Sequence, residues 1–117
     1  MTAAPVTPKT GIAYKIIDAA EWDAAQAAGA YAGSAVDLAD GYIHMSSADQ
    51  LGETAAKHYA GRTGLVLLTV DLDALGAALV WEPSRGGAMF PHLYADLPIS
   101  AVIQAAPFDA PKAASEA

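Results

Sequence analysis

The stretch D-G-Y-I-H-M-S-S-A-D-Q-L at residues 40–51 decides the fold, because a strand pattern turns into a helix pattern within it. Residues 41–45 predict a short strand, whose alternation turns Ile43 and Met45 toward the core. The opposite face of this strand then carries the polar side chains of Tyr42, His44 and Ser46. Because His44 lies between two hydroxyl-bearing residues on that face, it is either a structural hydrogen-bonding residue or part of a site.

The helix that follows is the clearest element of the chain. Ser47 and Gln50 have the spacing of a capping box, and apolar residues recur at helical spacing from Ala48 to Tyr59. On the N-terminal side, the alternation of residues 12–16 predicts a half-buried strand. It leads into a second helix over residues 18–29, with a capping-box pattern at its start and a glycine at its end.

The rest of the chain adds strands and connections. Residues 30–40 show no period and are expected to be irregular, and residues 65–70 are apolar throughout, which predicts a central strand buried on both faces. The remaining expected elements are one helical turn at residues 71–75 and strands at residues 79–82, 90–94 and 99–105. The spacing of these elements predicts a single α+β domain over residues 11–109 with two main helices and flexible tails at residues 1–10 and 110–117.

Composition excludes several classes of partner. The chain has 117 residues, a net charge of −7 and only six scattered basic residues, so it lacks the clustered basic face that binds duplex nucleic acid, RNA or an anionic membrane. No apolar run approaches the roughly 18 residues that span a bilayer, and no secretory signal precedes the domain. Together with the absence of cysteine, these features predict a soluble cytoplasmic protein. The oligomeric state stays open.

One loop has the composition of a binding site. The segment W-E-P-S-R-G-G at residues 81–87 is closely followed by F-P-H-L-Y at residues 90–94. Arginine suits a carboxylate or phosphate, and paired glycines allow close approach of a ligand. The candidate ligand-binding residues are therefore Trp81, Glu82, Ser84, Arg85, Gly86, Gly87, His92 and Tyr94, together with Tyr42, His44 and Ser46. The alternative is a tight turn in which Arg85 pairs with Glu82 and Trp81 packs in the core.

Other chemistries lack their sequence patterns. The three histidines, His44, His58 and His92, have no metal-ligand spacing, so no metal site is predicted. No serine-hydrolase elbow, dinucleotide-binding glycine motif or P-loop is present either.

Several motifs in order resemble a bacterial domain-of-unknown-function family over nearly all of residues 12–103. They are I-A-Y-K-I at 12–16, E-W at 21–22, G-x-Y-x-G-S-x-x-D at 29–37, D-G-Y-I-H-M-S at 40–46, Q-L-x-x-T-A at 50–55, L-V-L-L-x-V-D at 65–71, and the two motifs at 81–87 and 90–94. This family is similar in fold to ADP-ribosyltransferases, and the order from His44 onward also resembles RNA 2′-phosphotransferases. The resemblance implies a mixed or split β core with a cleft for a dinucleotide, which makes NAD the candidate cofactor.

The resemblance also implies roles for single residues. His44 would hold a ribose hydroxyl, Arg85 would meet a phosphate, and Glu82 would polarise a ribose hydroxyl in the transition state. Either Tyr42 or Tyr59 would stack on a nicotinamide-like ring. These assignments make His44, Glu82 and Arg85 the catalytic candidates.

Two functions remain open at this stage. The first is an enzyme that binds NAD, ADP-ribose or a related phosphorylated nucleotide and transfers a group from it. The second is a non-catalytic domain that binds a small metabolite or a protein segment. The second is motivated by the first strand, which offers Tyr14 and Lys15 where the transferases usually carry histidine or arginine, and by the presence of only two arginines.

Overall fold

The computed structural model describes residues 11–84 and 87–110. In chain order its strands are β1 (Ile12–Asp18), β2 (Ala30–Tyr31), β3 (Ile43–His44), β4 (Leu65–Asp71), β5 (Leu79–Pro83), β6 (Met89–Leu93), β7 (Leu97–Pro98) and β8 (Val102–Phe108). The α-helices are α1 (Ala19–Ala28), α2 (Ala35–Asp40) and α3 (Ala48–His58), and two 3₁₀ helices lie at Leu72–Ala78 and Ile99–Ala101. Within the described residues, no helix is both long and apolar enough to cross a membrane.

The β core is split between two three-stranded sheets. One has the order β1-β4-β8 and the other β3-β6-β5, while β2 pairs with β7. The two large sheets meet where Tyr14 in β1 and Ser46 exchange backbone hydrogen bonds of 2.8 and 2.9 Å. The α+β class and the two main helices are confirmed. Of the mixed or split core that was expected, the described strands form a split one, because they divide into two separate three-stranded sheets. All the ladders between described strands are antiparallel.

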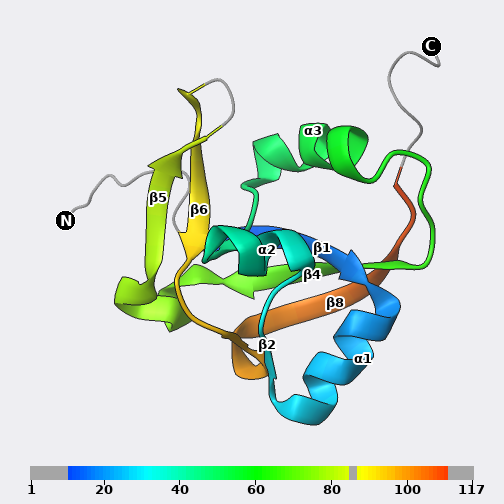
Figure 1. Ribbon diagram of the computed structural model, residues 1–117, viewed down its shortest axis with the longest axis horizontal. Coiled ribbons are helices and arrows are strands. Elements are labelled where there is room, and N and C mark those ends of the chain that lie inside the picture. The colour runs from blue at the N-terminus through cyan, green and yellow to red at the C-terminus, as the bar shows by residue number, and fades with distance from the viewer. Residues whose placement is uncertain (1–10, 85–86, 111–117) are drawn as a thin grey trace.

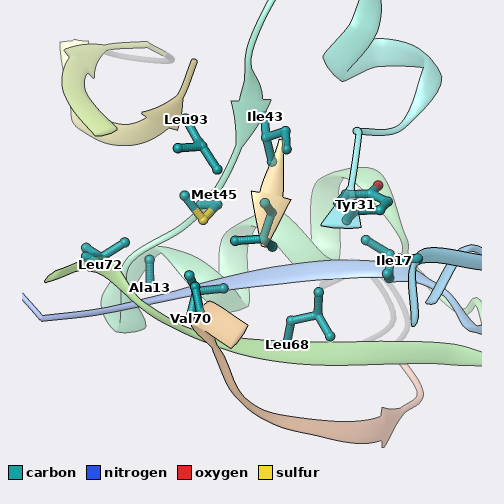
Figure 2. Packing of buried hydrophobic residues seen from close by; sticks show 12 residues of the cluster. Ala13, Ile17, Tyr31, Ile43, Met45, Leu68, Val70, Leu72 and Leu93 are labelled. Atoms are coloured by element: carbon teal, nitrogen blue, oxygen red, sulfur yellow. The ribbon is translucent and has the colours of Figure 1, made fainter. Parts of the chain in front are cut away.

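The main core lies between the two large sheets (Figure 2). Ala13, Ile17, Leu68 and Val70 from β1 and β4 pack against Ile43, Met45 and Leu93 from the other sheet, and all of these are buried. The predicted inward orientation of Ile43 and Met45 is therefore confirmed, and β4 is the central strand as expected. The helix α3 covers the other face of the β1-β4-β8 sheet, where Ala55 packs on Ile16 and Leu65, and the β5–β6 hairpin rises at one end of that sheet (Figure 1).

The strand expected from the alternation of residues 12–16 is confirmed as β1. Ile12 itself is 37% exposed, because Ala13 and Ile17 occupy the core face of β1 while Ile16 is buried under α3. Two other expectations for the first 40 residues were wrong. Asp18 is the N-cap of α1 but its side chain makes no capping hydrogen bond. The supposedly irregular residues 30–40 form β2 and α2, whose few residues are too short to show a period.

Two expectations at the later turns were also imprecise. The helical turn expected at residues 71–75 is 3₁₀, and Gly76, with φ 61° and ψ −141°, separates it from a second short 3₁₀ piece within Leu72–Ala78. Ile99–Ala101 is 3₁₀ rather than strand, so β8 begins at Val102. At the C-terminal boundary, Ala110 is buried and donates its N–H to the carbonyl of Arg62 over 2.9 Å.

Candidate functional site

A groove of about 610 Å³ lies where β1, α2 and α3 converge. Its walls come from residues 14–18 of β1, from residues 34–37 and 40 at α2, and from one side of α3 and the turn beyond it. Of the residues singled out from the sequence, the groove is lined by His44, Ser46, Tyr59, Ser84 and His92. Its volume lies in the range of small-molecule sites, about 300–1,000 Å³.

A buried ion pair forms the floor of this groove. The Nζ atom of Lys15 lies 3.1 Å from Oδ1 and 3.0 Å from Oδ2 of Asp37, and these residues are only 6% and 2% exposed. Burial lowers the pKa of Lys15 below its ordinary value, against the effect of Asp37. Burial alone would raise the pKa of Asp37, but the Lys15 ammonium and hydrogen bonds from Ser34 and His44 outweigh it and lower that pKa. The carboxylate is therefore a fixed negative charge.

The imidazole of His44 is held between two carboxylates of α2. Its Nδ1 lies 2.6 Å from Oδ1 of Asp37 and its Nε2 lies 2.9 Å from Oδ2 of Asp40, while its backbone N–H also donates to Asp37 over 3.1 Å. Carboxylates only accept hydrogen bonds, so both contacts are satisfied when both ring nitrogens carry a proton. The Asp37 side is buried, whereas Asp40 is 48% exposed. His44 therefore has one rigid contact and one exchangeable contact.

The position of Asp37 is fixed by the start of α2. The hydroxyl of Ser34 accepts the N–H of Asp37 over 3.2 Å, and Oδ2 of Asp37 accepts the N–H of Ser34 over 2.9 Å, which forms a capping box. Gly33 precedes it with φ +120°, and a Cβ there would lie 2.8 Å from the Cβ of Asp37. The glycine thus allows the chain to pass close to the carboxylate.

Gly33→Ala is expected to lower the free energy of unfolding by about 2–4 kcal/mol, because it adds a steric clash to a strained backbone. The matched control is Gly29→Ala, where φ is +90° but an added Cβ meets nothing within 4 Å. In that control only the cost of placing alanine at a positive φ should remain, which lowers the free energy of unfolding by about 1–2 kcal/mol. Urea unfolding of both variants measures the difference. Equal losses in the free energy of unfolding would show that the close approach of Gly33 to Asp37 does not affect stability.

Two other groove residues are held by buried polar contacts. Ser46 is 4% exposed and its hydroxyl lies 2.8 Å from that of Thr54 in α3. The hydroxyl of Tyr59 donates to the carbonyl of Ile16 over 3.1 Å, and burial raises the pKa of Tyr59. The guanidinium of Arg62 lies over the Tyr59 ring, 5.5 Å from its centroid, and pairs with Asp18. This end of the groove therefore holds a planar cation on an aromatic face.

A second cluster lies on the β3-β6-β5 sheet beside the groove. The ring of Tyr42 stacks on that of His92 with 4.1 Å between the ring centroids, and its centroid lies 5.2 Å from that of the Tyr94 ring. Nδ1 of His92 is 2.7 Å from Oε1 of Glu82, and the Tyr94 hydroxyl donates to the same oxygen over 2.8 Å. These hydrogen bonds lower the pKa of Glu82. Glu82 is thus engaged by its neighbours within the sheet, and His92 and His44, a register pair 5.6 Å apart, connect the cluster to the groove.

The remaining candidates of the W-E-P-S-R-G-G loop separate in space. Trp81 is half-buried and packs against the main core, as the alternative interpretation of the loop expected. Ser84 and Gly87 form a turn in which the Gly87 N–H donates to the Ser84 carbonyl over 2.8 Å. Arg85 and Gly86 lie outside the described residues.

The sequence interpretation did not include the charged residues of the groove among the site candidates, and those around His44 are Lys15, Asp37 and Asp40. Asp37 stood in the G-x-Y-x-G-S-x-x-D motif, and the S-x-x-D spacing at Ser34 could have indicated its capping role. Lys15 was noted only as a departure from the transferase pattern on the first strand, and its burial was not expected because a lysine in a strand ordinarily lies on the solvent face. Within residues 11–84 and 87–110, no group of three or more His, Cys, Asp or Glu side chains is arranged to hold a metal ion.

Comparison with known proteins identifies relatives across most of the chain. Residues 16–105 match the family described as "Protein of unknown function (DUF952)". The crystal structure of protein CC0527 from Caulobacter crescentus is 56% identical, with a TM-score of 0.81 over 84% of this chain and 86% of that one. A crystal structure of its double mutant is 54% identical with the same TM-score and coverage. Its solution NMR structure is 56% identical, with a TM-score of 0.76 over 84% of each chain. None of the curated proteins matches this chain.

Proposed function

The chain belongs to the DUF952 family of proteins of unknown function, and we propose that it is an enzyme that binds NAD, ADP-ribose or a related phosphorylated nucleotide in the groove and transfers a group from it. The observation that carries this proposal is the chemistry of the two ends of the groove. One end pairs a guanidinium with the Tyr59 ring, and the other pairs the His44 ring with a carboxylate. A ligand with a planar cation and an oxygen-rich part, such as NAD, matches both ends.

The aromatic end suits the nicotinamide ring. In NAD this ring is planar and carries a positive charge, and such cations bind on aromatic faces next to carboxylates. Asp18 and Glu21 line the groove together with Tyr59 and Arg62. Arg62 lies over the Tyr59 ring and pairs with Asp18, so the cationic ring would take the place of this guanidinium on the aromatic face. Tyr59 is therefore favoured over Tyr42 as the stacking partner, because Tyr42 does not line the groove.

The polar end suits the ribose-phosphate part. His44 lines the groove and is oriented by the buried carboxylate of Asp37, while its second nitrogen contacts Asp40, which also lines the groove. A histidine oriented in this way is positioned to donate a hydrogen bond to a ligand once the outer contact opens. In the proposed transfer, the bond between C1′ of the ribose and the nicotinamide nitrogen breaks. Nicotinamide leaves with the bonding electron pair, and the acceptor forms a new bond to C1′. The resemblance in fold to ADP-ribosyltransferases, stated from the sequence motifs, motivates this reaction class.

Binding measured by isothermal titration calorimetry tests the proposal. NAD is expected to bind more tightly than ADP-ribose, which lacks the cationic ring. His44→Ala should weaken both by about 10-fold or more, the equivalent of a hydrogen bond to a charged group. Lys57→Ala is the matched control, because Lys57 is exposed on α3 and does not line the groove. Circular dichroism verifies that each variant is folded.

Three outcomes separate the candidate functions. Release of nicotinamide by the wild type, reduced in His44→Ala, supports the enzyme. Binding without any product over long incubation favours the non-catalytic binding domain. Equal binding by wild type and His44→Ala, or no binding of any nucleotide, overturns the proposal.

A further inference from the structure

We propose that Asp40 occupies the position of an anionic oxygen of the ligand, and that a phosphate-type oxygen displaces it from Nε2 of His44. The inference rests on the proposed function for the identity of the ligand and adds the ligand atom that His44 recognises. It also assigns Asp40 as an internal competitor for the site. The two contacts of the His44 ring are unequal.

The inner contact of the ring is permanent. Asp37 is 2% exposed, receives the Lys15 ammonium and is held by the capping box of α2, so its carboxylate has no room to leave. It fixes Nδ1 of His44 at 2.6 Å and thereby fixes the direction of Nε2. The ring cannot turn without breaking this contact, and the His44 backbone N–H donates to the same carboxylate oxygen.

The outer contact is exchangeable. Asp40 is the last residue of α2, is 48% exposed, and reaches Nε2 over 2.9 Å. Its carboxylate lies at the C-terminal end of the helix, where negative charge is disfavoured, and no basic residue is present in that last turn. A half-exposed side chain in this position can move away at small cost.

Charge balance indicates which ligand group takes its place. Lys15 and Asp37 neutralise each other, so Asp40 is the carboxylate left to balance the His44 ring when that ring donates from both nitrogens. A neutral hydroxyl in place of Asp40 would leave a positive charge at the edge of the groove without its partner, whereas a phosphate oxygen restores the balance and forms a charge-assisted hydrogen bond. His44 therefore meets a phosphate of the nucleotide, and the ribose hydroxyl expected from the family resemblance lies elsewhere in the groove.

The test uses inorganic phosphate as the probe and the ring nitrogens of His44 as the reporter. Nitrogen-15 NMR follows Nδ1 and Nε2 of His44 during titration of wild type, Asp40→Asn and Asp40→Ala. Both variants remove the competing charge, so phosphate is expected to bind them about 5-fold or more tightly than wild type, with the shift change centred on Nε2. The control is Asp23→Asn, since Asp23 is exposed on α1 and does not line the groove. It should behave as wild type.

The outcomes distinguish this inference from the proposed function. Unchanged or weaker phosphate binding in both Asp40 variants, or a response that avoids Nε2, overturns the inference even if NAD binds and depends on His44. Tighter phosphate binding at Nε2 supports the inference, and if NAD then fails to bind, only the nucleotide proposal is lost. Thermal unfolding of each variant verifies that the groove is intact during the titration.

Discussion

Lys15→Met is expected to lower the free energy of unfolding by about 3–5 kcal/mol, because it leaves the buried carboxylate of Asp37 without its partner. Methionine fills a similar volume and is apolar, so the loss of packing is small and the loss of charge compensation dominates. Asp37 is 2% exposed and cannot recover its hydration without opening the groove. Urea unfolding at neutral pH, followed by circular dichroism, measures the loss.

The matched control is Lys57→Met. Lys57 is an exposed lysine on α3, and its replacement should change stability by no more than about 0.5 kcal/mol. If Lys15→Met and Lys57→Met lower the free energy of unfolding by the same amount, the Lys15–Asp37 ion pair does not stabilise the floor of the groove. A large loss restricted to Lys15→Met supports the account and shows that the pair holds α2 on the sheet.

The sequence predicted well those features that depend on local period. The alternation of residues 41–45 placed Ile43 and Met45 in the core, and the Gln50 side chain accepts the Ser47 N–H over 2.9 Å, as the capping pattern expected. It also pointed to His44, because the core-facing neighbours of that residue forced its ring to the other side. Local rules were sufficient in these cases, since each interaction lies within a few positions of the chain.

The sequence predicted poorly those features that depend on distant segments. Lys15 and Asp37 are 22 positions apart, and neither the strand pattern of the first nor the short helix around the second indicates that they meet. The alternation of Ile12, Tyr14 and Ile16 predicted a β1 strand that is buried on one face only. In the structure α3 covers one face of β1 and the second sheet covers the other, so residues on both faces are buried. Tertiary covering of both faces overrides a two-residue period.

The second large effect is expected in the double variant Lys15→Met with Asp37→Leu. Replacing a buried ion pair by apolar residues of similar volume is often neutral or stabilising, so this variant should regain stability relative to Lys15→Met alone. It still loses the capping contact of Ser34 and the partner of the His44 backbone N–H, which cost about 1 kcal/mol each. The His44 ring also loses its contact with Asp37, but its side chain is 31% exposed and can bond to water instead. A deficit of about 2 kcal/mol from wild type is expected, compared with about 3–5 kcal/mol for the single variant.

Regained stability should not restore function in this double variant. Without Asp37 the His44 ring loses the contact that fixes Nδ1, so Nε2 no longer has one direction and phosphate should bind at least about 10-fold more weakly than to wild type. The ring nitrogen shifts and the urea midpoint are measured on the same samples. A double variant as unstable as Lys15→Met would mean that the carboxylate matters through its capping hydrogen bonds rather than through the ion pair. A stable double variant that still binds phosphate at Nε2 would show that Asp37 does not position His44. The ring would then have to be held by the rings of Tyr42 and His92, whose centroids lie 4.6 and 5.6 Å from the centroid of the His44 ring.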